Sequence, residues 1–408
     1  MLLEQSRIRQ ARTHLSIQIP LALSKTALYN TYDNSPKVQQ IVERLGESNP
    51  LKMHLDGLLG SAVSFIIRAL FKKSERPFLI VLNDKEEAAY YLNDLEQMIG
   101  EQDVLFYPGS YRRPYQIEDT DNANVLLRAE VLNRINSRKK PAVIVSYPEA
   151  LFEKVVTRKD LDKNTLKVSV GDKISIDFIN EVLFEYEFKR VDFITEPGEF
   201  SVRGGIVDVF SFSNDNPYRI EFFGNEVDSI RSFDVGTQLS IEIQKKITII
   251  PNVENKVFQE NRESFLDYIS EKTVIFIQNT EDLLSQLDKQ FSRAEEAFEK
   301  LSKDIKHATP DQLFLNQRTF IKRALDFSIV ELSSKPIFKI AEKFEFHMQP
   351  QPSFNKQFDL LLNNLNENHF NGYKNYLFCS NENQAKRFHD IFETLDEANS
   401  ENIRKQYN

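Results

Sequence analysis

Three short runs that are almost entirely apolar limit what this chain can fold into more than any other feature. They are FLIVL at 78–82, AVIV at 142–145 and TVIFI at 273–277. Each has the length of one strand and none alternates with polar residues, which is typical of parallel strands covered on both sides by helices. Helical patterns lie between such runs, and Asp84 is placed to cap one of these helices. The chain is therefore predicted to contain a doubly wound parallel α/β sheet.

The pattern changes twice along the chain. Strand and helix alternate from about residue 40 to 155, within a first segment of residues 1–155. Residues 156–251 instead contain alternating strands joined by tight turns such as Pro197-Gly198 and Gly224-Asn225. An α/β pattern returns in residues 252–344. The middle segment is predicted to be an antiparallel β-rich domain, and the periodicity alone leaves open whether the third segment rejoins the first.

Residues 345–408 form a last block with its own pattern. It predicts a helix at 356–366, a strand at 376–379 and a helix at 382–395. A helix-strand-helix piece cannot close a sheet by itself, so we expect a partial α/β domain that is cut short or completed by something else. The single cysteine, Cys379, lies in the strand pattern YLFCS and is expected to be a buried structural thiol. One cysteine also excludes an intramolecular disulfide.

Composition narrows the class of function. A formal charge of -9 argues against a globally basic nucleic-acid binder, and the basic clusters at 111–113 and 138–140 are interpreted as solvated loop charges. No apolar run approaches the ~20 residues needed to span a bilayer, and the N-terminus lacks the pattern of a secretory signal. We therefore expect a cytoplasmic protein. The six histidines are dispersed, so no metal site is predicted.

The octapeptide GLLGSAVS at 57–64 has the frame of a phosphate-binding P-loop without its chemistry. Gly57 opens the frame and Ser64 closes it, but Ala62 replaces the second glycine and Val63 replaces the lysine that contacts the phosphates. Valine cannot neutralise a triphosphate. We predict a degenerate, non-functional loop, and an ordinary strand-to-helix turn is the simplest interpretation of the octapeptide taken alone.

Residues 188–240 carry the most specific motifs of the chain. This stretch resembles the UvrA-binding domain shared by UvrB, a nucleotide-excision-repair protein, and the transcription-repair coupling factors. The matching elements are Gly198-Glu199-Phe200, Arg203-Gly204-Gly205, Asp208-Val209-Phe210, Tyr218–Phe223 (YRIEFF) and Ser229–Asp234 (SIRSFD). The flanking segments, up to about residues 40 and 400, resemble the same proteins.

The resemblance implies a fold and selects between the two families. It implies a UvrB-like helicase-type lobe made of residues 1–155 and 252–344, with the β-rich domain inserted. UvrB has a working ATP-binding motif where Val63 stands here, whereas the coupling factors have lost it. UvrB also carries a long aromatic hairpin after the strand matching 103–107, for which the connection here is too short. The chain thus resembles the N-terminal region of a coupling factor.

The function that this resemblance implies is non-catalytic. Such a module recruits UvrA to lesions at which RNA polymerase has stalled. In the family, the chain continues beyond the position matching 408 into a domain that contacts RNA polymerase and a motor that uses ATP and Mg²⁺ to translocate on double-stranded DNA. For residues 1–408 the resemblance implies no catalytic residue, no cofactor and no metal.

Four residues are predicted to bind UvrA. In the family the residues matching Arg203, Arg219 and Phe223 contact UvrA, and Arg190 matches a UvrB arginine on the corresponding surface. Alternation along 218–223 independently places Arg219, Glu221 and Phe223 on one face, where an aromatic beside an arginine is typical of an interface hot spot.

Other interpretations of these residues and of the chain remain open at this point. The arginines can simply pair with Glu199, Glu221 or Asp208, and a bulge at Gly224 would turn Phe223 into the core. The chain as a whole could instead be a nucleotide-dependent enzyme that uses the loop at 57–64, or a DNA-binding module that uses 111–113 and 138–140.

Overall fold

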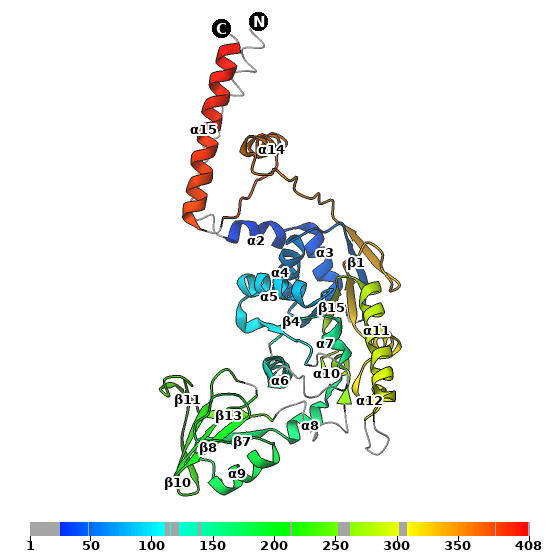
Figure 1. Ribbon diagram of the computed structural model, residues 1–408. Helices are drawn as coiled ribbons and strands as arrows, with labels where there is room; N and C mark the ends of the chain where they lie inside the picture. Colours follow the sequence, from blue (N-terminus) through cyan, green and yellow to red (C-terminus); the bar gives the residue numbers. More distant parts are fainter. Residues whose placement is uncertain are drawn as a thin grey trace. The chain divides into compact units, whose positions relative to one another are not determined.

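A computed structural model describes most of the chain. It covers residues 25–47, 49–110, 115, 122–137, 140–212, 214–251, 262–301, 308–379 and 381–406. The chain divides into two compact units (Figure 1). The larger is Tyr32–Met348, and the smaller joins Met1–Thr31 to Gln349–Asn408. The helix α2, Lys25–Asp33, runs across the first boundary between them.

The larger unit contains a seven-stranded sheet in which every pairing is parallel. The strand order is β17-β1-β16-β15-β2-β4-β3. The strands are β1 Lys52–Asp56, β2 Phe78–Val81, β3 Val104–Phe106, β4 Val143–Ser146, β15 Val274–Ile277, β16 Ser328–Glu331 and β17 Glu342–Glu345. All residues of β2, β4, β15 and β16 are buried. The prediction of a doubly wound parallel α/β sheet is confirmed.

Helices cover both sides of this sheet. Figure 1 shows α4 and α5 on one side and α11 on the other. The helices are α3 Pro36–Leu45, α4 Ala62–Ser74, α5 Lys85–Ile99, the 3₁₀ turn η1 Glu101–Asp103, α6 Asn122–Ser137, α7 Pro148–Phe152, α10 Phe265–Tyr268, α11 Thr280–Glu299, α12 Pro310–Leu313 and α13 Gln317–Ala324. Asp84 caps α5 as predicted, because its Oδ1 accepts a hydrogen bond from the Glu87 N–H at 2.7 Å. In the described ranges, no helix combines the length and apolarity needed to cross a membrane.

Two segments that are far apart in the sequence build the parallel sheet together. β15 and β16 come from the later segment, yet they lie between β1 and β2 of the earlier one. β15 pairs with β2 from Val274 opposite Phe78 onward, and β16 pairs with β1 with Ile329 opposite Lys52. Neither segment can complete the sheet without the other, because β1 and β2 would lack the neighbours β16 and β15 that lie between them.

A β-rich domain is inserted between β4 and β15. Its six-stranded sheet has the order β12-β11-β10-β9-β8-β7, antiparallel except for the pair β7 and β8. The strands are β7 Lys189–Arg190, β8 Glu199–Arg203, β9 Ile206–Val209, β10 Tyr218–Phe223, β11 Glu226–Phe233 and β12 Ser240–Ile243. Two antiparallel ribbons tie the entry of the insertion to its exit. They are β5 Val155–Val156 with β14 Arg262–Glu263, and β6 Leu166–Ser169 with β13 Lys246–Ile249.

This domain also contains two helices that the expected run of strands did not include. They are α8 Arg158–Lys163 and α9 Ile176–Glu185. The signals for α9 are present in the sequence: Ser175 caps it, and Ile179 and Leu183, one turn apart, are its buried residues. This helix was not predicted because it is short and lies between short strands in the sequence.

The connection after β3 is anchored by a buried ion pair. Arg128 Nη1 lies 3.4 Å from Glu153 Oε2, and both side chains are almost completely buried. The same nitrogen donates to the Pro108 carbonyl at 2.9 Å, while Glu153 accepts from the Ser110 N–H and hydroxyl. These contacts fix residues 108–110, where the chain leaves the sheet; residues 111–114 and 116–121 lie outside the described part of the chain.

The smaller unit corrects the prediction for residues 345–408. In this part of the chain the described elements are the helices α14 Phe358–Phe370 and α15 Glu382–Gln406, which pack through Phe358 and Phe388 with ring centroids 5.9 Å apart. The predicted strand at 376–379 is wrong, since residues 373–379 form neither helix nor strand. Cys379 is half-buried rather than buried. An apolar run becomes a strand only when another strand pairs with it, and no strand is found among the described residues of this unit.

The octapeptide at 57–64, predicted to be a degenerate P-loop, forms the turn from β1 to α4 and the first residues of α4. Gly57 has φ of 77°, and a Cβ at this position would lie 1.9 Å from the carbonyl oxygen of Phe346. That close approach accompanies a hydrogen bond from the Phe346 N–H to the Asp56 carbonyl at 2.7 Å. Gly60 has φ of 54°, but nothing lies within 4 Å of its hypothetical Cβ. Gly57 is therefore required both for its backbone conformation and for the contact with Phe346.

We expect Gly57→Ala to lower the free energy of unfolding by about 1–3 kcal/mol more than Gly60→Ala does. Both substitutions add the cost of a positive φ, but only the first forces the Phe346 backbone to move. Urea denaturation of the two variants measures the difference directly. Equal destabilisation would show that the approach of Phe346 does not constrain this turn.

Candidate functional site

One side of the six-stranded sheet carries a row of charged residues across neighbouring strands. Asp208 of β9 lies opposite Arg219 of β10, which lies opposite Arg231 of β11. The other side of the sheet packs on α9, where the rings of Phe184 and Phe200 meet edge to face at 5.3 Å. We call the first side the arginine face and define it by Arg203, Asp208, Arg219, Glu221, Phe223 and Arg231.

The centre of the arginine face is a buried carboxylate. The Asp208 side chain is only 2% exposed, and it forms ion pairs with both Arg203 and Arg219. Arg219 binds it through two nitrogens, with Nε to Oδ1 at 2.7 Å and Nη2 to Oδ2 at 2.9 Å. Two guanidinium groups share one carboxylate, so this cluster carries one surplus positive charge. The bidentate geometry also fixes the orientation of the Arg219 side chain.

Arg219 is held on its other sides as well. Its guanidinium lies over the ring of Phe233, 4.4 Å from the centroid, and Phe233 belongs to a small buried cluster with Ile194 and Phe210. Nη2 also donates to Gln238 Oε1 at 3.3 Å. The hydrogen bonds to Asp208 raise the pKa of Arg219 above its ordinary value. With 19% of its side chain exposed, Arg219 is held by these contacts and is mostly shielded from solvent.

Arg203 and Phe223 are the most exposed residues of this face. The Arg203 side chain is 41% exposed and lies 5.2 Å from the centroid of the exposed Phe193 ring. Phe223, at the end of β10, is 84% exposed. Exposure of a phenyl ring to water is unfavourable, so covering it with a partner would contribute to binding.

The neighbouring ion pair is balanced. Arg231 binds Glu221, which also accepts a hydrogen bond from the Ser229 hydroxyl at 2.7 Å. These two donors hold the pKa of the Glu221 carboxyl below its ordinary value, the Ser229 bond contributing most. The surplus positive charge of the arginine face therefore comes from the cluster around Asp208. An arrangement with exposed aromatic rings beside fixed guanidinium groups suits a binding surface rather than a reaction.

The structure decides two alternatives for these residues: which carboxylate the arginines pair with, and whether Phe223 faces the core. Both Arg203 and Arg219 do pair with a neighbouring carboxylate, which is Asp208; Glu199 instead accepts from the backbone N–H groups of Thr195 and Glu196. Phe223 is not turned into the core. The register shift in this hairpin lies between Glu221 and Phe222 in the pairing with β11, and alternation along β10 is maintained.

Arg190 is separated from the other predicted residues. In β7 it pairs in register with Phe200, whose side chain packs on α9. Neighbouring residues in register point to the same side of a sheet, so Arg190 lies on the side opposite Arg203 and Arg219, at an exposed edge. The structure thus brings three of the four predicted residues together and leaves the fourth apart.

Two exposed apolar residues near this face were missed by the sequence analysis. Phe193 contacts Arg203, and Ile243 of β12 lies opposite Arg231 in register. The alternating pattern Ser-Ile-Glu-Ile at 240–243 indicated a strand with one apolar face. It gave no indication that this face would remain exposed.

Residues 62–64 of the predicted degenerate P-loop form the start of α4 and pack against their surroundings. Ala62 begins α4, the Val63 side chain is part of the hydrophobic core, and the buried Ser64 hydroxyl lies 3.3 Å from Asp94 Oδ2. A side chain at 63 that points into the core is not placed like the phosphate-binding lysine of a P-loop.

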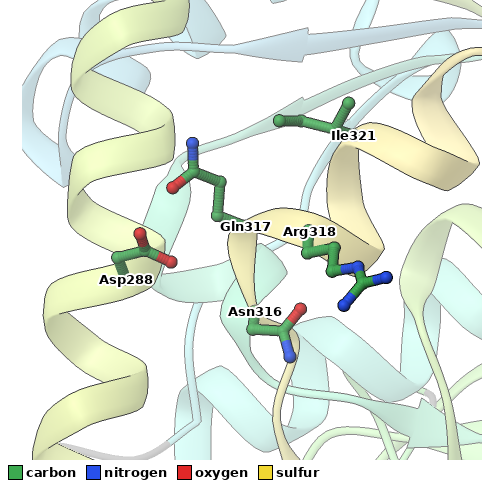
Figure 2. Close-up of a pocket in the computed structure, with 5 residues that line it drawn as sticks. All are labelled: Asp288, Asn316, Gln317, Arg318 and Ile321. Atoms are coloured by element: carbon green, nitrogen blue, oxygen red, sulfur yellow. The ribbon is translucent and has the colours of Figure 1, made fainter.

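Two other features of the described residues bring polar side chains together. A surface pocket between α11 and the start of α13 is lined by one carboxylate, one guanidinium, two amides and one aliphatic side chain (Figure 2): Asp288, Arg318, Asn316, Gln317 and Ile321. Its Asn316 side chain already caps α13 by accepting from the Thr319 N–H at 2.9 Å. On α15, His389, Asp390 and Glu393 bring their ligating atoms within 4.8 Å of one another, but both carboxylates are exposed and the histidine is only half-buried. Neither arrangement indicates a specific ligand.

Comparison with known families identifies the class of the β-rich domain. Residues 166–254 match the family of the UvrB interaction domain. This range contains the whole arginine face. The resemblance inferred from the motifs in 188–240 is confirmed.

Longer matches extend the similarity to particular proteins. The chain is 32% identical over 216 residues to the transcription-repair-coupling factor of Bacillus subtilis, and 29% identical over 230 residues to that of Myxococcus xanthus. These matches cover 53% and 55% of this chain but only 18% and 19% of the relatives. The UvrABC system protein B of Thermotoga neapolitana is 25% identical over 256 residues, which are 59% of this chain and 38% of that protein. The chain thus matches about a fifth of the length of the coupling factors.

We expect Asp208→Ala to destabilise the protein by about 2–3 kcal/mol. It leaves two guanidinium groups without their buried partner, and the cost stays below that of a fully buried pair because both arginines reach water. Glu221→Ala is the matched control, since it breaks a half-exposed pair in the same sheet and should cost less than about 1 kcal/mol. Urea denaturation measures both. Equal losses would show that Asp208 does not organise the face.

Proposed function

We propose that this chain is the N-terminal, UvrB-like module of a transcription-repair coupling factor and that its arginine face binds UvrA. The observation that carries the proposal is the position of this face within the UvrB interaction domain match at 166–254, with Phe223 exposed at its edge. The similarity to coupling factors of two bacteria supports the same assignment. In this role the module recruits UvrA to lesions where RNA polymerase has stalled.

The geometry suggests how the surface would work. Asp208 and Phe233 hold Arg219 in place before binding, so little side-chain entropy is lost on contact. Arg203 and the ring of Phe223 remain accessible and can act as the charged and apolar anchors of the interface. The surplus positive charge favours an acidic patch on UvrA and makes the association rate sensitive to salt.

The α/β lobe serves as a scaffold in this proposal. Val63 is committed to the core, so the lobe lacks the cation that contacts the β and γ phosphates in a P-loop. ATP and Mg²⁺ would be used by the motor of the whole coupling factor, where double-stranded DNA and RNA polymerase would also bind. We place the whole protein in the cytoplasm, with its substrates.

Phe223→Ala should weaken the affinity for UvrA about 30-fold or more, the loss of roughly 2 kcal/mol expected of an interface hot spot. Because the ring is exposed, the midpoint of thermal unfolding should stay close to that of the unaltered chain. Phe178→Ala is the matched control: it removes an exposed ring from α9 in the same domain and should leave affinity unchanged. Isothermal titration calorimetry with purified UvrA measures the affinity.

Arg203→Ala tests the charged anchor in the same titration. Alanine is preferable to glutamate because a second carboxylate beside Asp208 would destabilise the fold for reasons unrelated to binding. Unchanged affinity in both Phe223→Ala and Arg203→Ala would contradict the assignment of the arginine face.

The scaffold role predicts that the chain does not bind nucleotide. Equilibrium dialysis with Mg²⁺-ATP should give a dissociation constant weaker than about 1 mM, since Val63 cannot supply the missing charge. Micromolar affinity would instead support a nucleotide-dependent enzyme.

A further inference from the structure

β12 forms one open edge of the six-stranded sheet. Among the described strands it pairs only with β11, and all four of its residues are exposed. Ile243 is 83% exposed, and Ile241 and the preceding Leu239 are exposed as well. A strand edge with exposed apolar side chains invites pairing with another chain, which native proteins usually prevent with charges, proline or a covering element, and Glu242 is the single charge in β12.

The backbone of β12 shows which of its groups are available. Gln244 N donates to Ile230 O at 2.9 Å, so residues 244 and 230 form a hydrogen-bonded pair of the antiparallel ladder. Such pairs alternate with non-hydrogen-bonded pairs, and Ile243 opposite Arg231 is the next pair along. The N–H and C=O of Ile243 therefore point away from β11, toward the open edge of the sheet.

This edge is continuous with the arginine face. Asp208, Arg219, Arg231 and Ile243 form one row across β9, β10, β11 and β12. In a non-hydrogen-bonded pair the two side chains lie close together, so Ile243 extends the surface of Arg231 up to the edge. A partner that covers Arg203 and Phe223 and extends along this row would reach the exposed backbone N–H and C=O of Ile243.

We propose that UvrA adds an extended segment to the open edge of β12, so that the complex contains a continuous sheet. This inference rests on the proposed function and names its binding mode. The added strand would exchange backbone hydrogen bonds with Ile243, place an apolar side chain against it and place an acidic side chain toward the arginine row, where the surplus positive charge lies. Backbone bonds supply affinity in strand addition, and the alternating side chains supply specificity.

Two substitutions of Ile243 test the contributions of its backbone and of its side chain to UvrA binding separately. Ile243→Pro removes an N–H that the sheet itself does not use, which is the position where an edge strand tolerates proline. Ile243→Ala removes the apolar side chain but keeps the N–H. We expect Ile243→Pro to weaken UvrA affinity at least tenfold beyond Ile243→Ala in calorimetry, with thermal unfolding midpoints of the two variants close to each other. Equal affinities for the two variants would overturn strand addition.

Hydrogen exchange of the unaltered chain tests the same point without a substitution. The amide of Ile243 should exchange fast in the free chain and at least tenfold slower with saturating UvrA. Unchanged exchange in a chain that demonstrably binds UvrA would overturn the inference.

The outcomes distinguish this inference from the proposed function. If Phe223→Ala loses UvrA while Ile243→Pro binds like Ile243→Ala, the strand addition is wrong and the arginine face stands. If the chain alone forms dimers in analytical ultracentrifugation, and Ile243→Pro makes it monomeric, the edge of β12 binds a second copy of the chain and the inference is also wrong.

Discussion

The fold depends on the insertion of β15 and β16 between β1 and β2. A buried parallel strand needs a neighbour on each side, and here the neighbours of the earlier strands come from a segment that follows the β-rich domain. The chain must therefore leave the sheet after β4 and return to it at β15. The ribbons β5 with β14 and β6 with β13 pair the segment that enters the inserted domain with the segment that leaves it. The inserted domain therefore begins and ends at one place. Its strands are free to form a second sheet whose exposed side is available for binding.

On that second sheet, one carboxylate organises the surface. Asp208 is buried and binds two arginines, and it leaves one of them fixed on Phe233 and the other half-exposed beside Phe193. A buried carboxylate with two guanidinium partners is satisfied, yet the cluster keeps a positive charge that faces solvent. The ion pairs that would explain the arginines as structural residues are thus the same contacts that, in the proposed function, hold the arginines in place for a partner. Structural and binding roles do not compete at this site.

Features that depend on residues close together in the sequence could be predicted, whereas features that need a distant partner could not. The strand at 78–82 and the cap at Asp84 were predicted because an unbroken apolar run and an Asx cap depend on nearby residues. The helix α9 was missed although its cap and apolar spacing were present, since short strands surround it. The strand at 376–379 was predicted from its composition and is absent, because a strand also requires a partner that no local pattern specifies. Alternation along 218–223 correctly separated Phe223 from the core, but it could not exclude a bulge.

The sequence by itself determined the α/β class, the presence of a β-rich insertion and the motifs that connect residues 188–240 to the UvrB interaction domain. It also determined that position 63, a valine, lacks the lysine side chain that contacts the phosphates in a P-loop. Only the tertiary structure decided that Asp208 joins Arg203 to Arg219, that Arg190 lies on the other side of the sheet and that Ile243 stands at an open edge in line with Arg231. The physical reason is that strand order and register bring together residues from different strands. Those pairings depend on contacts across the whole domain, whereas periodicity reports only the faces of each strand taken alone.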